Sequence, residues 1–467
     1  MIVPHSRLLL WTALLVVPCA TLAGLAPNQL VPLGFLLAAF GGSAVLDAWL
    51  ARRALGGIGV QLPTVVRLSK DRPGRIEMRL RNHQQRARRL RVGLGLPAEI
   101  LARQVEILAQ LPEGAEFSRL SWECTPSRRG RYFLEACYLE ALSPLGFWAW
   151  RASTPLQTEI RVYPNLLHER KNLAAVFLNR AATGIHAQRQ VGQGRDFEKL
   201  REYIPGDSFE EIHWKATAKR GHPVTKVFQI ERTQEVYVIV DSSRLSAQVL
   251  DSGSRIQLPR PSAQSSSRPE LSELPAVTRD SVLERFLTAA LILGQVAQRQ
   301  GDAFGVASFS DRIHSFVRAK TGKNHYAACR DALFALQPSR VTPDYEELFS
   351  FIRLRLRRRA LLVFLTDLDD PLLAESFIRN LEIIQRQHLV LVHMLRPPGT
   401  RPLFSQSEGQ TIDDVYHHLG GHLRWEKLRE LERILKRRGV HLSLLEQEAL
   451  SAQMVAQYMS VKQRQLI

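Results

Sequence analysis

The chain has 467 residues, too long for one ordinary hydrophobic core, so two or three domains are predicted. A hydrophobic content of 45% with 23% charged residues is typical of a globular protein and excludes a disordered chain. The formal net charge of +18 predicts attraction to an anionic partner or membrane surface. No nucleic-acid-binding module accompanies the dispersed basic residues, so a membrane is favoured over nucleic acid. Four cysteines without a CxxC pair predict buried free thiols in a reducing compartment.

Two uncharged apolar stretches, residues 8–25 and 30–45, lie near the N-terminus. The second reaches the length of a bilayer only by extending past Asp47. Arg7 precedes the first stretch and Arg52 follows the second, whereas the connection between them has no basic residue. This distribution predicts a transmembrane hairpin with both ends in the cytosol. The alternatives are a cleaved secretory signal, which the second stretch argues against, and a buried helix of a soluble domain.

The next hundred or so residues have the pattern of short strands. Apolar and polar side chains alternate in residues 65–68 and 75–80, as they do in strands with one buried face. Turn signals at residues 127–130 and 143–147 interrupt the pattern. A β-sandwich of immunoglobulin-like kind is therefore predicted.

From about residue 235 onward, apolar strands alternate with amphipathic helices. The predicted strands are 236–240, 304–309, 361–365, 389–395 and 440–445, and the predicted helices are 281–300, 372–386, 413–438 and 449–464. This alternation predicts an α/β domain with a doubly wound parallel sheet, whose ligand edge lies at the carboxyl ends of the strands. The predicted domains are 1–56, 57–170 and 235–467, with a signature segment at 171–234 and a disordered insertion, rich in Ser, Pro and Arg, at about 246–279.

The densest group of charged and aromatic residues lies in the segment from Gly192 to Gly221. A linker whose charges pair with one another is one interpretation of this segment. A second is an envelope-associated hydrolase that uses Asp196, His213 and Lys215 for acid–base chemistry, although no nucleophile–base pair accompanies them. The third is a partner-binding surface. Its residues would be Gly194, Asp196, Phe197, Arg201, Tyr203, Pro205, Gly206, Asp207, Trp214 and Lys215.

A second group of polar residues follows the first strand of the α/β domain. Mg²⁺ prefers hard oxygen ligands, and Asp241 and Ser243 could supply them together with Thr342 and Asp367. Leu245 stands where a second serine would be needed, and a neighbouring arginine adds positive charge. The site is therefore expected to be degenerate and the protein to work without a cofactor, with bound Mg²⁺ as the less favoured alternative.

The run GRDFEKLREYIPGD, followed by IHWKATAKRG and VFQIE, closely resembles the signature of the bacterial domain-of-unknown-function-58 proteins. The resemblance implies a von Willebrand factor A-like fold for residues 235–467 and no established enzymatic activity. Proteins of similar setting are encoded beside MoxR-type AAA+ ATPases, which are thought to act as chaperones. The analogy implies a membrane-bound adaptor or assembly factor for such an ATPase and a protein client, located in the inner membrane with its soluble domains in the cytosol.

Overall fold

The computed structural model describes residues 1–25, 30–52, 54–167, 191–204, 209–229, 234–250, 280–403, 405 and 412–464. The described residues fall into two compact units, 1–165 and 166–464. Residues 251–279, which make up most of the predicted disordered insertion, lie outside the described residues. The four cysteines are buried free thiols, as predicted.

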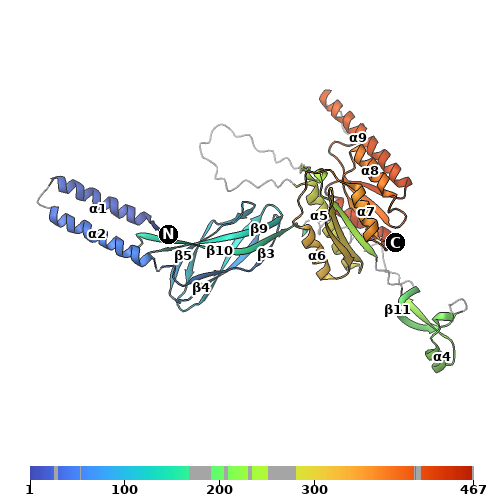
Figure 1. The fold of residues 1–467 in the computed structure, drawn as a ribbon, viewed down its shortest axis with the longest axis horizontal. Helices are drawn as coiled ribbons and strands as arrows, with labels where there is room; N and C mark the ends of the chain where they lie inside the picture. Colours follow the sequence, from blue (N-terminus) through green and yellow to red (C-terminus); the bar gives the residue numbers. More distant parts are fainter. Residues whose placement is uncertain are drawn as a thin grey trace. The chain divides into compact units, whose positions relative to one another are not determined.

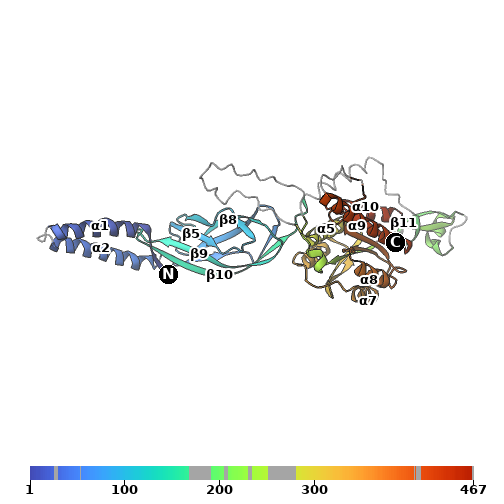
Figure 2. The same ribbon diagram turned by 90° about the horizontal axis from the view of Figure 1, so that it is seen from above.

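Two apolar helices belong to the first unit. Helices α1 (Ser6–Leu25) and α2 (Leu30–Ala51) lie side by side in both Figure 1 and Figure 2. The stretch Val31–Ala51 is long and apolar enough to cross a membrane, and only 11% of its most apolar part is buried within the protein. The corresponding apolar part of α1, Ser6–Leu22, is shorter. By length and composition, the described residues therefore contain one candidate membrane span.

Two sheets enclose the core of the first unit. One has the strand order β1-β10-β9-β5-β7, with β3 also paired to β10, and the other has the order β2-β4-β8-β6. Their bounds are β1 Ile2–Pro4, β2 Ile58–Gln61, β3 Val65–Ser69, β4 Gly74–Asn82, β5 Arg88–Leu94, β6 Ile100–Ala102, β7 Glu106–Leu111, β8 Phe117–Pro126, β9 Gly130–Leu142 and β10 Trp148–Tyr163. The alternation of residues 75–80 is realised in β4, where Ile76, Met78 and Leu80 are fully buried between the sheets. The prediction of a β-rich region is thus confirmed.

Asp47 is an acidic residue near the end of the apolar helix α2, and its contacts explain its position. Its buried carboxylate accepts hydrogen bonds from Ser143 Oγ at 2.5 Å, Leu145 N–H at 3.0 Å and Phe147 N–H at 3.2 Å. Trp148 donates its indole N–H to a carbonyl one turn earlier in α2, at 2.8 Å. Because these donors satisfy the buried carboxylate, the end of α2 is held against the turn between β9 and β10.

The second unit contains a six-stranded sheet of order β15-β14-β13-β16-β17-β18. All neighbouring strands are parallel except β14 and β15. The strand bounds are β13 Glu235–Asp241, β14 Ala303–Phe309, β15 Ile313–Lys320, β16 Leu361–Leu365, β17 Leu389–Leu395 and β18 His441–Leu445. The chain order reverses at β13, and in such sheets a crevice forms where the order reverses, outside the carboxyl ends of the strands.

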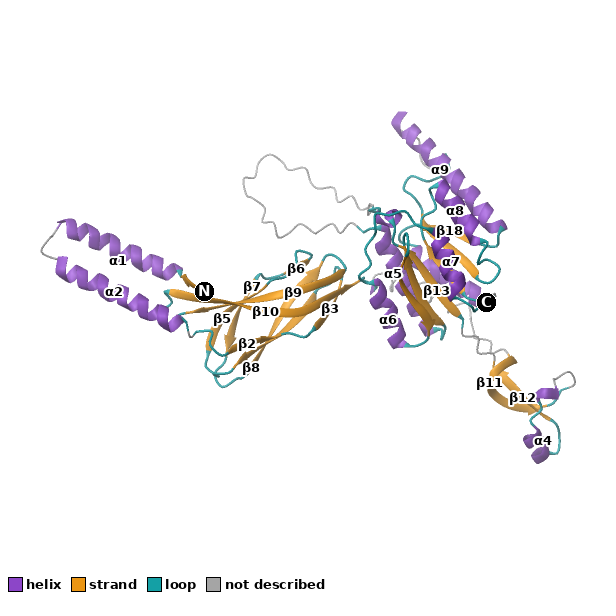
Figure 3. Cartoon of the chain, viewed as in Figure 1, coloured by secondary structure: helices purple, strands orange, loops and turns teal. Residues whose placement is uncertain are grey.

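Helices cover both faces of this sheet (Figure 3). Those on one face are α5 Val282–Arg299, α6 Lys323–Leu333 and α10 Leu450–Gln463, and those on the other are α7 Tyr345–Arg355, α8 Pro371–Leu381 and α9 Ile412–Arg437. Each layer of helices encloses a separate apolar core with the sheet. The predicted doubly wound sheet is therefore confirmed.

Some elements of the second unit differ from the sequence-based prediction. The edge strand β15 and the helix α7 were not predicted. Helix α8 ends at Leu381, five residues before the predicted end at 386. Ile384 lies in the turns that follow and is still buried, so the apolar spacing continues after the helix has ended.

Candidate functional site

The signature segment contains a small folded hairpin. Strand β11 (Val191–Glu202) pairs antiparallel with β12 (Val224–Gln229), and between them lie the 3₁₀ turn η2 (Phe209–Glu211) and the helix α4 (Trp214–Arg220). We call this group of elements the signature hairpin.

Short polar contacts hold α4 against the strands. His213 is the N-cap of α4, and its Nδ1 accepts a hydrogen bond from the Ala216 N–H at 3.0 Å. At the other end Gly221 adopts a left-handed conformation with φ of 73° and donates its N–H to the Thr217 carbonyl at 2.9 Å. The hydroxyl of Thr217 in turn accepts the N–H of Val224 at 3.1 Å. In this structure His213 caps a helix, so the contact it makes is structural.

The signature hairpin nevertheless exposes apolar side chains. Trp214 is 69% exposed and Phe209 is 74% exposed, and Ile204 is also exposed. The ring of Phe209 stacks on that of Tyr203 with 6.0 Å between centroids. Aromatic side chains that remain in water on a folded scaffold are typical of residues that bind another protein. We call Ile204, Phe209 and Trp214 the apolar patch.

The residues predicted for partner binding are only partly described. Tyr203 stacks on Phe209, and Trp214 and Lys215 are exposed next to each other on α4. Arg201 lies in β11 and donates to the carbonyl of Glu202 at 3.3 Å. Gly194, Asp196 and Phe197 also lie in β11, with side chains outside the described part, and Pro205, Gly206 and Asp207 lie outside the described residues altogether. The sequence analysis did not predict Ile204 and Phe209 as binding residues. Both are apolar and lie within a few residues of Gly206, which could have indicated them.

Asp241 lies at the carboxyl end of β13, where the sheet order reverses. Its carboxylate is completely buried, accepting the Ser243 N–H at 2.8 Å and the Thr366 hydroxyl at 2.7 Å. The Thr366 hydroxyl also lies 3.0 Å from the hydroxyl of Tyr345. Burial raises the pKa of Asp241 and raises the pKa of Tyr345 well above its ordinary value. The network joins the ends of β13 and β16 to the start of α7.

The other predicted metal ligands lie around this network. Ser243 Oγ accepts the N–H of Leu245 at 3.3 Å. Thr342 is exposed on a loop. The carbonyl of the preceding residue, Val341, accepts a hydrogen bond from the backbone N–H of Arg244. Asp367 follows β16, and burial raises its pKa to about 6. The structure therefore brings all four predicted positions to one edge of the sheet.

Two features of the donor set at this edge disfavour Mg²⁺ binding, and an empty site stays a prediction. Both carboxylate oxygens of Asp241 already accept hydrogen bonds from the protein, and Leu245 offers no hydroxyl. Within the described residues, no three Cys, His, Asp or Glu side chains are placed to hold a metal ion together. The contacts of Asp241 are those of a buried structural group.

A further apolar surface lies on the N-terminal half of α9. Five exposed side chains recur at helical spacing on one side of the helix: Ile412, Val415, Tyr416, Leu419 and Leu423. Gly421 is on the opposite side, where an added Cβ would lie 2.1 Å from the carbonyl oxygen of Gly399. The covered side of the helix is thus the glycine side, and the apolar side faces away from the domain. In Figure 1 this half of α9 extends past the other helices of its unit.

The second unit thus combines a doubly wound α/β domain with the folded signature hairpin. Residues 199–255 and 275–401 match the family model described as "Protein of unknown function DUF58". The chain therefore carries the DUF58 region, and the resemblance seen in the signature is confirmed. No curated protein matches the chain in sequence.

Several solved structures resemble parts of the chain. The SpRpn10 VWA domain is 7% identical, with a TM-score of 0.26, covering 47% of this chain and 93% of its own. The conserved hypothetical protein BatB from Bacteroides thetaiotaomicron is 11% identical, with a TM-score of 0.26, covering 49% and 99%. The ASH/PapD-like domain of human CEP192 is 11% identical, with a TM-score of 0.17, covering 23% and 87%. TM-scores this low carry no functional inference.

Proposed function

We propose that the chain is a membrane-anchored adaptor that binds a partner protein through the signature hairpin. The apolar patch carries this proposal, because Trp214 and Phe209 stay exposed although the elements around them are folded and capped. Burial of such aromatic side chains supplies much of the binding energy in protein interfaces.

The anchor would be the pair α1 and α2, crossing the inner membrane twice so that the β-rich part of the first unit and the second unit lie in the cytosol. The basic flanks of the two helices and the apolar character of Val31–Ala51 support this arrangement. The β-rich part of the first unit would act as an immunoglobulin-like spacer. The partner that the DUF58 resemblance implies is a MoxR-type AAA+ ATPase acting on a further protein client.

Binding of the full-length chain in lipid nanodiscs to the purified MoxR-type ATPase of the same organism tests this proposal. Trp214→Ala should weaken binding at least tenfold, since it removes the largest exposed aromatic side chain of the apolar patch. Leu372→Ala is the matched control, because Leu372 is 76% exposed on α8, outside the signature hairpin. Because we propose that no metal takes part, Mg²⁺ and EDTA should give the same affinity.

Equal binding by wild type and Trp214→Ala, with both chains folded, would show that the signature hairpin is only scaffold. A different result would assign the interaction to the carboxyl edge of the sheet. In that case EDTA would abolish binding, added Mg²⁺ would restore it, and Asp241→Ala would abolish binding even with Mg²⁺ present. Among the described side chains, His213 caps α4 and Lys215 is exposed on the same helix, so neither supports the hydrolase alternative.

A further inference from the structure

Strand β18 forms one edge of the six-stranded sheet. Within the described part of the chain it pairs only with β17. The Leu445 carbonyl accepts the N–H of Arg396, the residue after β17, at 2.8 Å. Backbone groups of successive residues in a strand point to opposite sides, so those of Leu442 and Leu444 point away from β17. The edge therefore offers N–H and C=O groups at two positions to an added strand.

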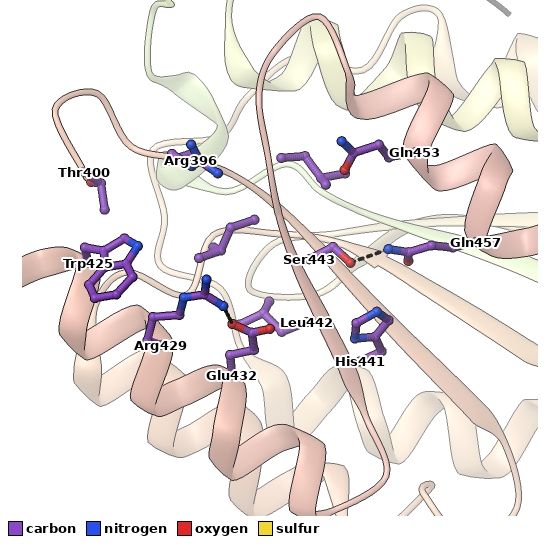
Figure 4. Close-up of a pocket in the computed structure, with 12 residues that line it drawn as sticks. Arg396, Thr400, Trp425, Arg429, Glu432, His441, Leu442, Ser443, Gln453 and Gln457 are labelled. Carbon is purple, nitrogen blue, oxygen red and sulfur yellow. Dashed lines mark hydrogen bonds and ion pairs between the residues drawn. The ribbon is translucent and has the colours of Figure 1, made fainter. Parts of the chain in front are cut away.

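This edge is the floor of a groove between two helices (Figure 4). All five residues of β18 line a hollow of about 240 Å³. Trp425, Arg429 and Glu432 of α9 line one side, and Gln453 and Gln457 of α10 line the other. The hollow is smaller than the roughly 300 Å³ at which small-molecule pockets begin. Its elongated floor of strand backbone fits a polypeptide better.

The opposite edge of the sheet is built differently. Strand β15 carries Arg318 and Lys320, and charged side chains on an edge strand oppose pairing with another strand. In β18, by contrast, residues 442–445 read Leu-Ser-Leu-Leu and carry no charge. Only one of the two edges is therefore chemically suited to take an additional strand.

We propose that the β18 groove binds an extended segment of a partner protein, which adds to the sheet as a further strand. Helices α9 and α10 flank the β18 edge and limit what can reach it. In a folded second copy the same two helices would flank its own β18, so the two edges could not approach each other. A free tail or loop has no such obstacle. This proposal concerns a surface separate from the signature hairpin and does not depend on the identity of the partner there.

The groove also indicates the sequence of the occupant. Side chains of an added strand alternate between the two faces of the sheet. Toward α10 they would meet amide and hydroxyl groups, since Gln457 Nε2 donates to Ser443 Oγ at 2.6 Å and Gln453 is exposed nearby. Toward α9 they would meet the ring of Trp425, over which Arg429 lies at 5.4 Å. The expected segment alternates small polar residues with aliphatic or aromatic ones.

A phage-displayed library of random dodecapeptides, selected on the full-length chain in nanodiscs, tests the proposal. Selected peptides should show the alternation and should slow amide exchange in residues 441–445. Leu444→Pro should weaken their binding at least tenfold, because proline removes the outward N–H yet is tolerated on an edge strand. Gln453→Trp fills the groove from α10 without changing the sequence of β18 and should have the same effect, whereas Leu372→Ala should have none.

Three results would overturn the proposal. The first is the absence of any selected peptide that distinguishes wild type from Gln453→Trp. The second is protection from exchange outside residues 441–445. The third is self-association of the chain that Leu444→Pro abolishes, which would make a second copy the occupant. If Leu444→Pro does not fold, Gln453→Trp and the exchange measurement still decide.

Discussion

In the second unit, some buried polar side chains have hydrogen-bond partners, whereas others have none within the described residues. The first kind stabilises the fold, and the second makes its stability depend on pH. Asp241 is satisfied by Ser243 and Thr366, so its burial supports the joint between β13 and β16. His393 in β17 is completely buried, and neither ring nitrogen has a hydrogen-bond partner within the described residues. Burial, with a smaller contribution from His441, lowers the pKa of His393 to about 3.

The lowered pKa of His393 makes the second unit sensitive to acid. In the unfolded chain this histidine binds a proton below about pH 6.5, whereas in the folded protein it does so only near pH 3. Protons therefore favour the unfolded state, and the free energy of unfolding falls as the pH drops through this range. Between pH 7 and pH 4.5 the loss should be on the order of 2–3 kcal/mol.

Calorimetric unfolding of the full chain measures this effect. His393→Met keeps an apolar side chain of similar volume and should remove that part of the pH dependence. His417→Met, at an exposed position of α9, should leave the pH dependence unchanged. An unaltered acid loss in His393→Met would contradict the prediction.

At the scale of secondary-structure elements, the position of a strand in the sheet decides whether its apolar side chains and backbone groups are covered. The apolar runs of β16 and β17 were predicted with correct ends, because both strands are covered by helices on both faces. The same apolar character in β18 belongs to an edge strand. Helix α9 combines a buried second half, anchored by Leu428 and Leu435, with an exposed apolar first half.

Asp47 accepts three hydrogen bonds that hold α2 against the turn between β9 and β10. Asp47→Ala would leave Ser143 Oγ and the two backbone N–H groups at the β9–β10 turn without their acceptor, so the first unit should lose about 2–4 kcal/mol of stability. Limited proteolysis of the full chain in nanodiscs should then cut at residues 143–147. Glu113→Ala is a control at an exposed turn. Resistance equal to that of wild type would show that the turn is held by other contacts.

At the scale of the whole molecule, charge and apolar segments predict the location of the chain. If α1 and α2 form a transmembrane pair, their two ends face the cytosol and the short connection faces the periplasm. Alkaline phosphatase fused after residue 53 should therefore be inactive, and the same enzyme fused at residue 28 should be active. A fluorescent protein fused after residue 53 should fluoresce. Phosphatase activity after residue 53 would exclude this topology.

The local pattern of the sequence was sufficient for a large part of this architecture. Apolar periodicity predicted the β-rich region and the doubly wound sheet, because side-chain burial follows the period of each element. The signature segment also predicts that Trp214 binds a partner, and the side chain of Trp214 is exposed. Such features depend on residues that are close together in the chain, so they can be predicted from the sequence alone.

Only the tertiary structure decided what depends on residues far apart in the chain. The sequence marks Asp241 as one residue of a degenerate metal site, and only the fold brings the hydroxyl of Thr366, 125 residues away, to its carboxylate. Asp47 looked like an interruption of an apolar helix until Ser143, 96 residues away, proved to be its partner. The edge position of β18 likewise follows from sheet order, which no local pattern encodes. Hydrogen bonds and strand neighbours across such separations are fixed by packing, so they appear only when the chain has folded.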